Sequence, residues 1–219
     1  MNKIRVAILV DGEFFLKRYR KLYKVPLKDP KKIADSFYTY VHNHAEDKYL
    51  YRIFYYDCYP LIKKAHNPIS KKCIDFSKTP QAIFRKQFFE ELKKKRKVAL
   101  RIGDIKTRLN WILRPDITKD LLKKKITIKD LNENDVFLDI IQKGVDIRIG
   151  VDIAALAYKK FVDQIVLISG DSDFVPAAKV ARREGIDFIL DPMWNHINLS
   201  LFEHIDGLKS FCPNPNKTS

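Results

Sequence analysis

Two apolar segments of this chain each end abruptly in acidic residues. The segment Val166 to Ile168 leads into Ser169-Gly170-Asp171-Ser172-Asp173, and Ile4 to Val10, apolar apart from Arg5, leads into Asp11-Gly12-Glu13. Apolar runs of this kind are typical of strands buried on both faces of a parallel sheet. Because open α/β sheets bind ligands at the carboxyl ends of their strands, we expect an α/β fold with a functional site at that edge.

Two further acids precede the second strand. Asp152 begins a small apolar helix that continues to Tyr158, and Asp146 lies six residues before Asp152. Six residues rotate an ideal helix by about 600°, so the two side chains converge only if Asp146 lies at the helix start or in the loop before it. Carboxylates gathered in one cleft repel each other unless a cation neutralises them, and hard oxygen ligands suit Mg²⁺ or Mn²⁺.

Helix capping is an alternative explanation for each acid taken singly. An aspartate after a strand is a common helix N-cap, and Ser172 or Asp173 could cap a helix running through Ala177 to Arg183. One helix start needs one cap, so capping does not explain Asp171 and Asp173 together. Two separate strands that both end in aspartate favour a site.

Four motifs, in chain order, resemble those of a known family. They are Asp11-Gly12, Lys143-Gly144-Val145-Asp146, Asp152-Ile153 and Ser169-Gly170-Asp171-Ser172-Asp173-Phe174. The set resembles the LabA-like branch of the NYN domains, within the PIN-like nuclease superfamily, and covers the first strand and its helix and then nearly everything from Gln142 to Leu190. The resemblance implies a three-layer α/β/α domain with a mostly parallel sheet, whose acids bind divalent metal and hydrolyse RNA phosphodiesters.

The resemblance also implies roles for single residues. Asp11, Asp152 and Asp171 match the central metal-site acids, Asp146 matches the acid that precedes them, and Asp173 matches an accessory acid. Many members of the family have Asn three residues after the first Asp, where this chain has Phe14. A substrate or metal contact made by that amide is therefore not expected here.

Other chemistries fit the sequence less well. Two metal ions can clamp a phosphodiester, one activating water and the other stabilising the leaving oxygen, without a Ser/His/Asp or Cys/His arrangement, and none is evident. The five histidines show no metal-ligand spacing, and no phosphate loop or dinucleotide-binding loop follows the first strand. A phosphatase that forms an aspartyl-phosphate is a rival, but such enzymes carry a second Asp where this chain has Glu13.

The basic residues concentrate in the middle of the chain. The sequence holds 42 Lys and Arg against 27 Asp and Glu, a formal charge of +15. Residues 61–129 hold 21 basic and 6 acidic side chains, which leaves 21 of each sign elsewhere. This excess favours an anionic partner, and we interpret residues 61–129 as a basic insertion that flanks the catalytic edge.

Within this segment we expect a helix from Pro80, capped by Thr79, and two strand-like runs, 98–102 and 108–113, that pair with each other. We expect the basic residues of this segment to follow an RNA backbone. They are Arg85, Lys86, Lys93, Lys94, Lys95, Arg96, Lys97, Arg108, Arg114, Lys123, Lys124 and Lys125. The aromatic residue that could stack on an unpaired base is Trp111. A solvated face is the alternative for the lysines, and core packing is the alternative for Trp111.

We expect one NYN/PIN-like domain over residues 1–212, with a disordered tail at 213–219. The three cysteines form no C-x-x-C pair and no apolar run is long enough to span a bilayer, so neither a zinc site nor a membrane partner is expected, and the expected location is cytoplasmic. The expected function is a metal-dependent (endo)ribonuclease. The alternative is a regulatory RNA- or DNA-binding protein with little hydrolytic activity. DNA cleavage and a homo-oligomer stay open.

Overall fold

The computed structural model describes residues 3–106 and 110–215. The main sheet has the strand order β11-β10-β9-β1-β2-β5-β8, in which the first six strands run parallel and β8 runs antiparallel to β5. The strands are Arg5–Asp11 (β1), Tyr49–Cys58 (β2), Val98–Lys106 (β5), Ile141–Lys143 (β8), Gln164–Ile168 (β9), Asp187–Asp191 (β10) and Gly207–Leu208 (β11). The predicted mostly parallel sheet is confirmed.

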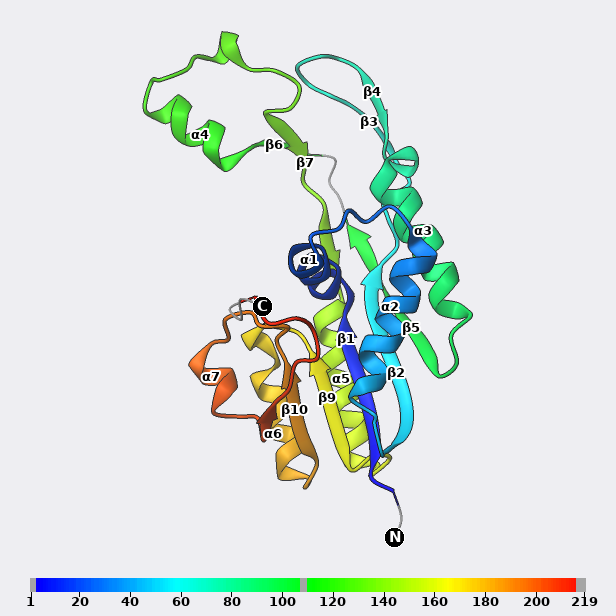
Figure 1. Cartoon of the computed structure of the whole chain (residues 1–219). Helices are drawn as coiled ribbons and strands as arrows, with labels where there is room; N and C mark the ends of the chain where they lie inside the picture. The colour runs from blue at the N-terminus through cyan, green and yellow to red at the C-terminus, as the bar shows by residue number, and fades with distance from the viewer. Residues whose placement is uncertain (1–2, 107–109, 216–219) are drawn as a thin grey trace.

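Helices cover both faces of this sheet (Figure 1). Successive side chains of a strand point to opposite faces, so Ile8 of β1 packs with α1, α2 and α3, whereas Leu9 packs with α5 and α6. The helices are Gly12–Tyr23 (α1), Pro30–Asn43 (α2), Pro80–Lys93 (α3), Val145–Tyr158 (α5), Val175–Arg183 (α6) and Leu199–Phe202 (α7). Within the described residues, no helix has the length and apolar character needed to cross a bilayer. The predicted three-layer α/β/α architecture is confirmed.

The strand register brings the ends of β1 and β9 to one edge. Val10 pairs with Ile168, so Asp11 and the loop from Ser169 to Asp171 follow neighbouring strand ends. Both strands are buried along their whole apolar length. The carboxyl edge therefore carries acids from two adjacent strands, as the sequence predicted.

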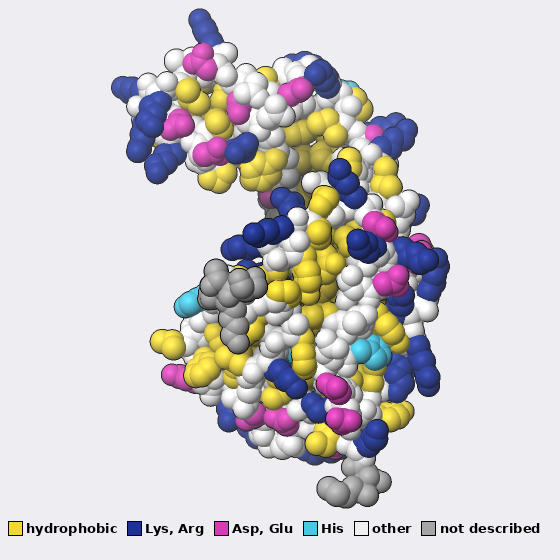
Figure 2. All heavy atoms as spheres, in the orientation of Figure 1, with side chains coloured by type: hydrophobic (Ala, Val, Ile, Leu, Met, Phe, Trp, Pro, Cys, Tyr) yellow, Lys and Arg dark blue, Asp and Glu magenta, His cyan; other side chains and the backbone are white. Residues whose placement is uncertain are grey.

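Two segments at the carboxyl ends of β2 and β5 form an arm, residues 59–78 and 110–140, that projects from the sheet (Figure 1). Its elements are β3 (Lys64–His66), β4 (Cys73–Asp75), β6 (Trp111–Leu113), α4 (Pro115–Leu122) and β7 (Val136–Leu138). The two segments join where the Asn67 amide donates to the Glu133 carbonyl at 3.0 Å and Lys72 pairs with the Glu133 carboxylate at 3.1 Å. Figure 2 shows a deep hollow between the arm and the body of the molecule.

The structure divides the basic segment 61–129 between the arm and the body. Helix α3 packs against α2, with Thr79 as its N-cap and Pro80 in its first turn as predicted, and β5 is a strand of the main sheet. The predicted pairing of 98–102 with 108–113 is wrong. β5 instead pairs in parallel with β2 inside the main sheet, and β6 pairs in antiparallel fashion with β7 in the arm. Pro213 to Pro215 form no helix or strand, and the rest of the predicted tail lies outside the described residues.

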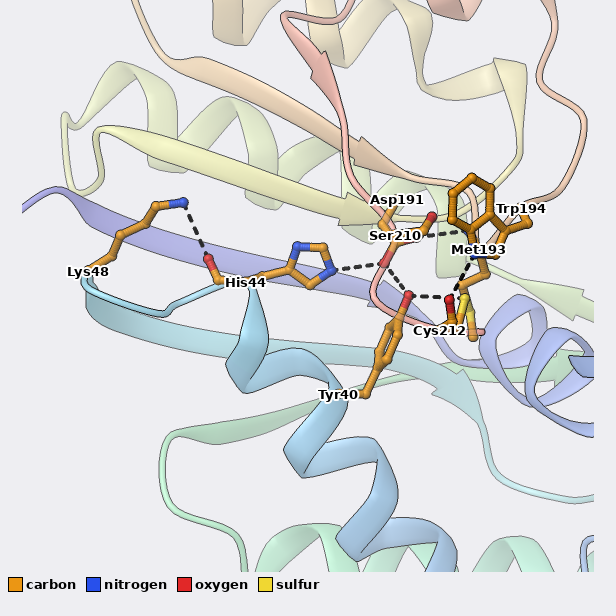
Figure 3. A network of polar contacts seen from close by, with 8 residues as sticks. All are labelled: Tyr40, His44, Lys48, Asp191, Met193, Trp194, Ser210 and Cys212. Carbon is orange, nitrogen blue, oxygen red and sulfur yellow. Dashed lines mark hydrogen bonds and ion pairs between the residues drawn. The ribbon is translucent and has the colours of Figure 1, made fainter. Parts of the chain in front are cut away.

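Asp191, at the end of β10, anchors the C-terminal segment to α2 (Figure 3). Its fully buried carboxylate accepts hydrogen bonds from the Tyr40 hydroxyl, from the Met193 N–H at 2.8 Å and from the Ser210 hydroxyl at 2.6 Å, and it lies 2.8 Å from His44 Nε2. Burial, and then the charge of Asp191, raises the pKa of Tyr40, so its hydroxyl stays protonated and donates.

We expect Asp191→Ala to lower the free energy of unfolding by about 3 to 5 kcal/mol, because it leaves several buried polar groups without their acceptor. Urea denaturation followed by circular dichroism measures the change. Asp116→Ala is the control, since Asp116 forms an exposed ion pair with Arg114 whose loss should change stability far less. Equal effects of the two substitutions would contradict a structural role for the Asp191 network.

Candidate active site

A pocket of about 530 Å³ opens at the carboxyl edge of the sheet. Its polar side chains come from the end of β1, the start of α1, the start of α5 and the segment after β9, and include Asp11, Glu13, Asp146, Ser169, Asp171 and Ser172. We call it the acid pocket. Three of the acids predicted from the sequence, Asp11, Asp146 and Asp171, thus line one pocket although they come from distant parts of the chain.

Asp11 is the most enclosed of these three acids. Its carboxylate caps α1 by accepting the Phe14 N–H at 3.0 Å, and the Ser169 hydroxyl donates to it at 3.5 Å. Burial raises the pKa of Asp11 to about 6, the hydrogen bond from Phe14 opposes this rise, and the negative charge of Asp146 adds to it. Ionisation of Asp11 therefore costs free energy in the folded chain, and a cation in the pocket would relieve that cost.

Two glycines allow the close packing around Asp11. A Cβ at Gly12 would lie 2.5 Å from the Tyr55 hydroxyl, and a Cβ at Gly170 would lie 2.8 Å from the Phe14 ring. Phe14 therefore packs over Gly170 at the wall of the pocket. It supplies an apolar surface at this wall of the pocket.

Asp146 lies at a helix start, one of the two positions from which the sequence analysis expected it to approach other acids. Helix α5 begins at Val145, directly after Gly144, so Asp146 lies in the first turn and reaches the pocket. The predicted helix start at Asp152 is wrong, because Asp152 lies in the middle of α5. Burial raises the pKa of Asp146, and the negative charges of Asp171 and Asp173 raise it further. Within the described residues, Asp146 forms no ion pair, so this end of the pocket carries uncompensated negative charge.

Asp171 combines the two roles that the sequence left open. It caps the short 3-10 helix Ser172–Phe174 by accepting the Asp173 N–H at 3.0 Å, and its side chain also lines the acid pocket. Asp173 lies beside the pocket, where it borders an apolar groove together with Asp146. The capping explanation therefore holds for Asp171, but it does not remove that carboxylate from the site.

The structure does not bring Asp152 to the acid pocket. Its carboxylate accepts a hydrogen bond from the Tyr56 hydroxyl at 2.8 Å and pairs with Arg101 Nε at 3.1 Å. Burial raises the pKa of Tyr56, so that hydroxyl donates. Asp152 thus fastens α5 to β2 and β5, and its charge is already compensated.

The donor chemistry of the pocket suits a hard divalent cation. Asp11, Asp146 and Asp171 offer carboxylate oxygens, and Ser169 offers a hydroxyl. Among the described residues, however, no three His, Cys, Asp or Glu side chains stand close enough together to hold a metal ion as they are. A cation would have to draw the exposed side chains of Asp146 and Asp171 toward Asp11.

Asp57 is an acid of this edge that the sequence analysis did not select. It lies near the end of β2 much as Asp11 lies at the end of β1, and this position was the signal that could have identified it. The buried carboxylate pairs with Arg85 at 2.8 Å and accepts from the Tyr55 hydroxyl at 3.3 Å. Burial raises the pKa of Asp57 to about 6, although the charge of Arg85 lowers it. Glu13, Ser169 and Asn195 also line the pocket and were missed.

The residues predicted to bind nucleic acid lie in several places. Arg85 is half-buried against Asp57, and Trp111 packs on Phe76 with ring centroids 6.4 Å apart, so the core-packing alternative describes Trp111. Arg114 pairs with Asp116 and Lys125 with Asp120 on the arm, where Lys123 and Lys124 are exposed. Lys86 is exposed on α3, and Arg108 lies outside the described residues.

The run Lys93–Lys97 lies at the opposite edge of the sheet from the acids. It connects the end of α3 to the start of β5, and strand starts form the amino edge of a parallel sheet. Lys93 pairs with Glu90 at 2.7 Å, Lys94 with Glu91 at 2.7 Å, and Lys95 with Asp35. The run therefore lies away from the acid pocket, and Lys93, Lys94 and Lys95 already have acidic partners.

The buried carboxylates predict how the stability of the protein without metal depends on pH. The pKa values of Asp11 and Asp57 are about 6 in the folded chain against 3.8 ordinarily, so between about pH 4 and 6 the folded state binds more protons than the unfolded state. Stability should therefore fall as the pH rises through this window. Asp11→Asn should raise the free energy of unfolding at pH 7 by up to about 3 kcal/mol, a gain that disappears near pH 4.

Thermal and urea unfolding of the wild type and Asp11→Asn at several pH values, in EDTA, test this expectation. Asp29→Asn is the matched control, because Asp29 is the exposed N-cap of α2 and accepts the Lys32 N–H at 2.9 Å. A gain in stability in the control as large as in Asp11→Asn would contradict the assignment to burial.

Known proteins share both the sequence pattern and the fold of this chain. Residues 5–197 match the model of the NYN domain family. The structure is similar to the crystal structure of a protein of unknown function from Vibrio parahaemolyticus, with a TM-score of 0.50 and 18% identity over 96% of this chain and 94% of that one, which shows a shared fold. None of the curated proteins matches the sequence. Since the family match spans most of the chain, this protein belongs to the NYN domain family, a family of PIN-like nucleases.

Proposed function

We propose that the protein is a metal-dependent ribonuclease that hydrolyses RNA phosphodiester bonds at the acid pocket. The observation that carries this proposal is the convergence of Asp11, Asp146 and Asp171 from three elements into one pocket at the carboxyl edge. Membership of the NYN family supports the same activity. These three acids would hold Mg²⁺ or Mn²⁺, and Asp173 would act as an accessory acid at the rim.

A bound divalent ion would supply activated water and stabilise the leaving 3′-oxygen. The chain's own residues hold the carboxylates in position. Asp11 is oriented by the Phe14 N–H and by the Ser169 hydroxyl, so one carboxylate is held in place before substrate arrives. Asp152 positions α5 through Tyr56 and Arg101, and through α5 it positions Asp146. We therefore propose a positioning role for Asp152 rather than metal binding.

The hollow between arm and body supports a path for the RNA strand (Figure 2). The arm stands on the carboxyl ends of β2 and β5, and the acid pocket lies at the same edge. Exposed Lys123 and Lys124 on the arm are candidates for phosphate contacts. A strand bound there would pass over the pocket.

The second candidate is an RNA- or DNA-binding regulator with little hydrolytic activity. Two observations favour it: Arg101 compensates the charge of Asp152, and Phe14 occupies a position where many family members have Asn. Such a protein would bind RNA through the arm and leave it uncut. Cleavage of mixed RNA substrates in Mn²⁺ separates the two candidates.

We expect cleavage to stop in EDTA and to return with Mg²⁺ or Mn²⁺, because the acid pocket needs a cation to act on a phosphodiester. Attack by water on phosphorus, with departure of the 3′-oxygen, should leave 5′-phosphate and 3′-hydroxyl ends. End-labelled RNA and mass spectrometry of the fragments identify these ends. A 2′,3′-cyclic phosphate would show attack by the RNA's own 2′-hydroxyl and would refute the mechanism.

A further inference from the structure

The outer face of α5 is apolar and exposed. Ile147, Val151 and Tyr158 are 73%, 60% and 61% exposed, and their spacing of four and seven residues places them on one side of the helix. The opposite side of the same helix is buried in the core, through residues such as Ile149 and Ile153. A helix that is apolar on two opposite sides is normally covered by other protein segments on both of them. A contiguous apolar patch that stays exposed marks an interaction site.

A groove of about 450 Å³ extends this apolar surface onto α6. Ile147, Gly150 and Ala154 line it from α5, and Pro176 and Val180 line it from α6. A Cβ at Gly150 would meet no atom within 4 Å, so the centre of α5 leaves open space above its backbone. We call the exposed residues of α5 and this groove the α5–α6 face.

The two ends of the α5–α6 face carry opposite charges. Both helices run from the carboxyl edge to the amino edge of the sheet, since α6 connects the end of β9 to the start of β10 and α5 ends before the start of β9. Asp146 and Asp173 lie where they begin, and Lys159 and Arg183 lie where they end. All four are exposed, and within the described part of the chain none of them forms an ion pair.

We propose that the α5–α6 face is the interface of a twofold-symmetric dimer in which α5 of one copy packs antiparallel to α5 of the other. Twofold interfaces must be self-complementary, and an antiparallel pair places the acidic end of each copy against the basic end of the other. Asp146 and Lys159 lie 13 residues apart, about 20 Å along the helix, so the symmetry axis passes close to Val151 and Ala154. Gly150 lets the two helices approach closely there.

A second copy fits this face better than RNA does. The middle of the face, around Val151 and Ala154, offers aliphatic side chains, and the exposed aromatic ring of α5, Tyr158, lies at its end, so the face has no series of rings on which successive bases could stack. The apolar middle with opposite charges at its two ends is complementary to itself.

The dimer would also change the charge at the rim of the acid pocket, an inference that rests on the proposed function. The pocket's own cationic side chain, Lys17, is paired with Glu13 at 2.6 Å. Lys159 and Arg183 of the second copy would compensate the charges of Asp146 and Asp173, so the dimer and a metal ion in the acid pocket would compete for Asp146.

Sedimentation velocity of the full chain without RNA tests the interface independently of any activity. The wild type should sediment as a dimer over a wide range of concentration, and Val151→Arg should sediment as a monomer. Val151 is exposed in a single copy, so the variant should keep its circular dichroism spectrum and melting temperature. Leu122→Arg is the matched control, because Leu122 is 80% exposed on the arm and its replacement should leave the dimer intact.

Charge exchange tests the antiparallel pairing. Lys159→Glu with Arg183→Glu makes both ends of the face acidic, and Asp146→Lys with Asp173→Lys makes both ends basic. Each double variant alone should be monomeric, and an equal mixture should recover a dimer that contains one chain of each kind. A monomeric wild type, a dimer that survives Val151→Arg, or a mixture that stays monomeric would overturn the proposal. None of these results depends on whether the protein cleaves RNA.

Discussion

Asp11→Asn and Asp171→Asn are each expected to lower the rate of metal-dependent RNA cleavage by at least about 100-fold while the fold stays intact. Asparagine keeps the shape of the carboxylate, and its side-chain oxygen can still cap the helix by accepting the hydrogen bond from the Phe14 or Asp173 N–H. It lacks the charge that holds a cation. The measurement is the single-turnover cleavage rate of a labelled RNA at saturating Mn²⁺. Isothermal titration with Mn²⁺ alone should show weaker binding in both variants.

Asp152→Asn is the informative control for this prediction. If Asp152 positions α5 through Tyr56 and Arg101, its amide should reduce cleavage by less than about tenfold and lower stability, while Mn²⁺ binding stays close to that of the wild type. A decrease in activity and in Mn²⁺ binding equal to that of Asp11→Asn would show that Asp152 binds metal and that the pocket rearranges around the ion. Wild-type cleavage in Asp11→Asn and Asp171→Asn would exclude the acid pocket as the active site.

Replacing Lys123, Lys124 and Lys125 together by Gln is expected to weaken RNA binding by the largest amount of any charge change on the arm. For a single strand, removing one lysine–phosphate interaction should flatten the plot of log affinity against log salt concentration by about 0.7, so removing the two at Lys123 and Lys124 should flatten it by about 1.4, and Lys125, which pairs with Asp120, should add less. Binding measured by fluorescence anisotropy at several salt concentrations gives the slope. The cleavage rate of bound RNA should change little, because these lysines lie away from the acid pocket.

The matched control removes the same number of charges at the other edge of the sheet. Lys93, Lys94 and Lys95 pair with Glu90, Glu91 and Asp35, and they precede the start of β5, far from the carboxyl edge. Their replacement by Gln should leave the salt dependence nearly unchanged. If the two triple variants weaken binding equally, RNA senses only the net charge of the protein, and the arm has no particular role.

The two sets of variants together decide between the proposed ribonuclease and the regulator. A protein that binds RNA through the arm and cuts it through the acid pocket loses affinity in one set and rate in the other. A regulator loses affinity with the arm lysines and shows no metal-dependent rate to lose. The oligomeric state is measured separately. A monomeric wild type would therefore contradict neither the ribonuclease nor the regulator.

The fold and the family could be predicted from the sequence because the signals that carry them are local. β1 and β9 are buried on both faces, so almost every residue in them is apolar, and the acids that follow mark the strand ends. Thr79 and Pro80 likewise identify the start of α3 by the chemistry of one helix turn. For Asp146 the sequence left two positions open, a helix start or the loop before it, and the structure has it in the first turn of α5.

The partners of the charged side chains depended on the tertiary structure. Asp152 faces Arg101 because the register pairs Tyr56 with Arg101 and the rotation of α5 presents Asp152 to both. Asp57 is buried because Arg85 reaches it from α3, and the basic segment divides because β5 joins β2 in the sheet. A local sequence pattern indicates which positions of an element are buried and with what period they recur. It does not indicate which distant residue lies opposite each position. The sequence by itself determined that the sheet is mostly parallel and that its carboxyl edge carries acids. The packing of elements far apart in the chain decided how β5 joins the sheet, which acids face the pocket and which lysines lie near it.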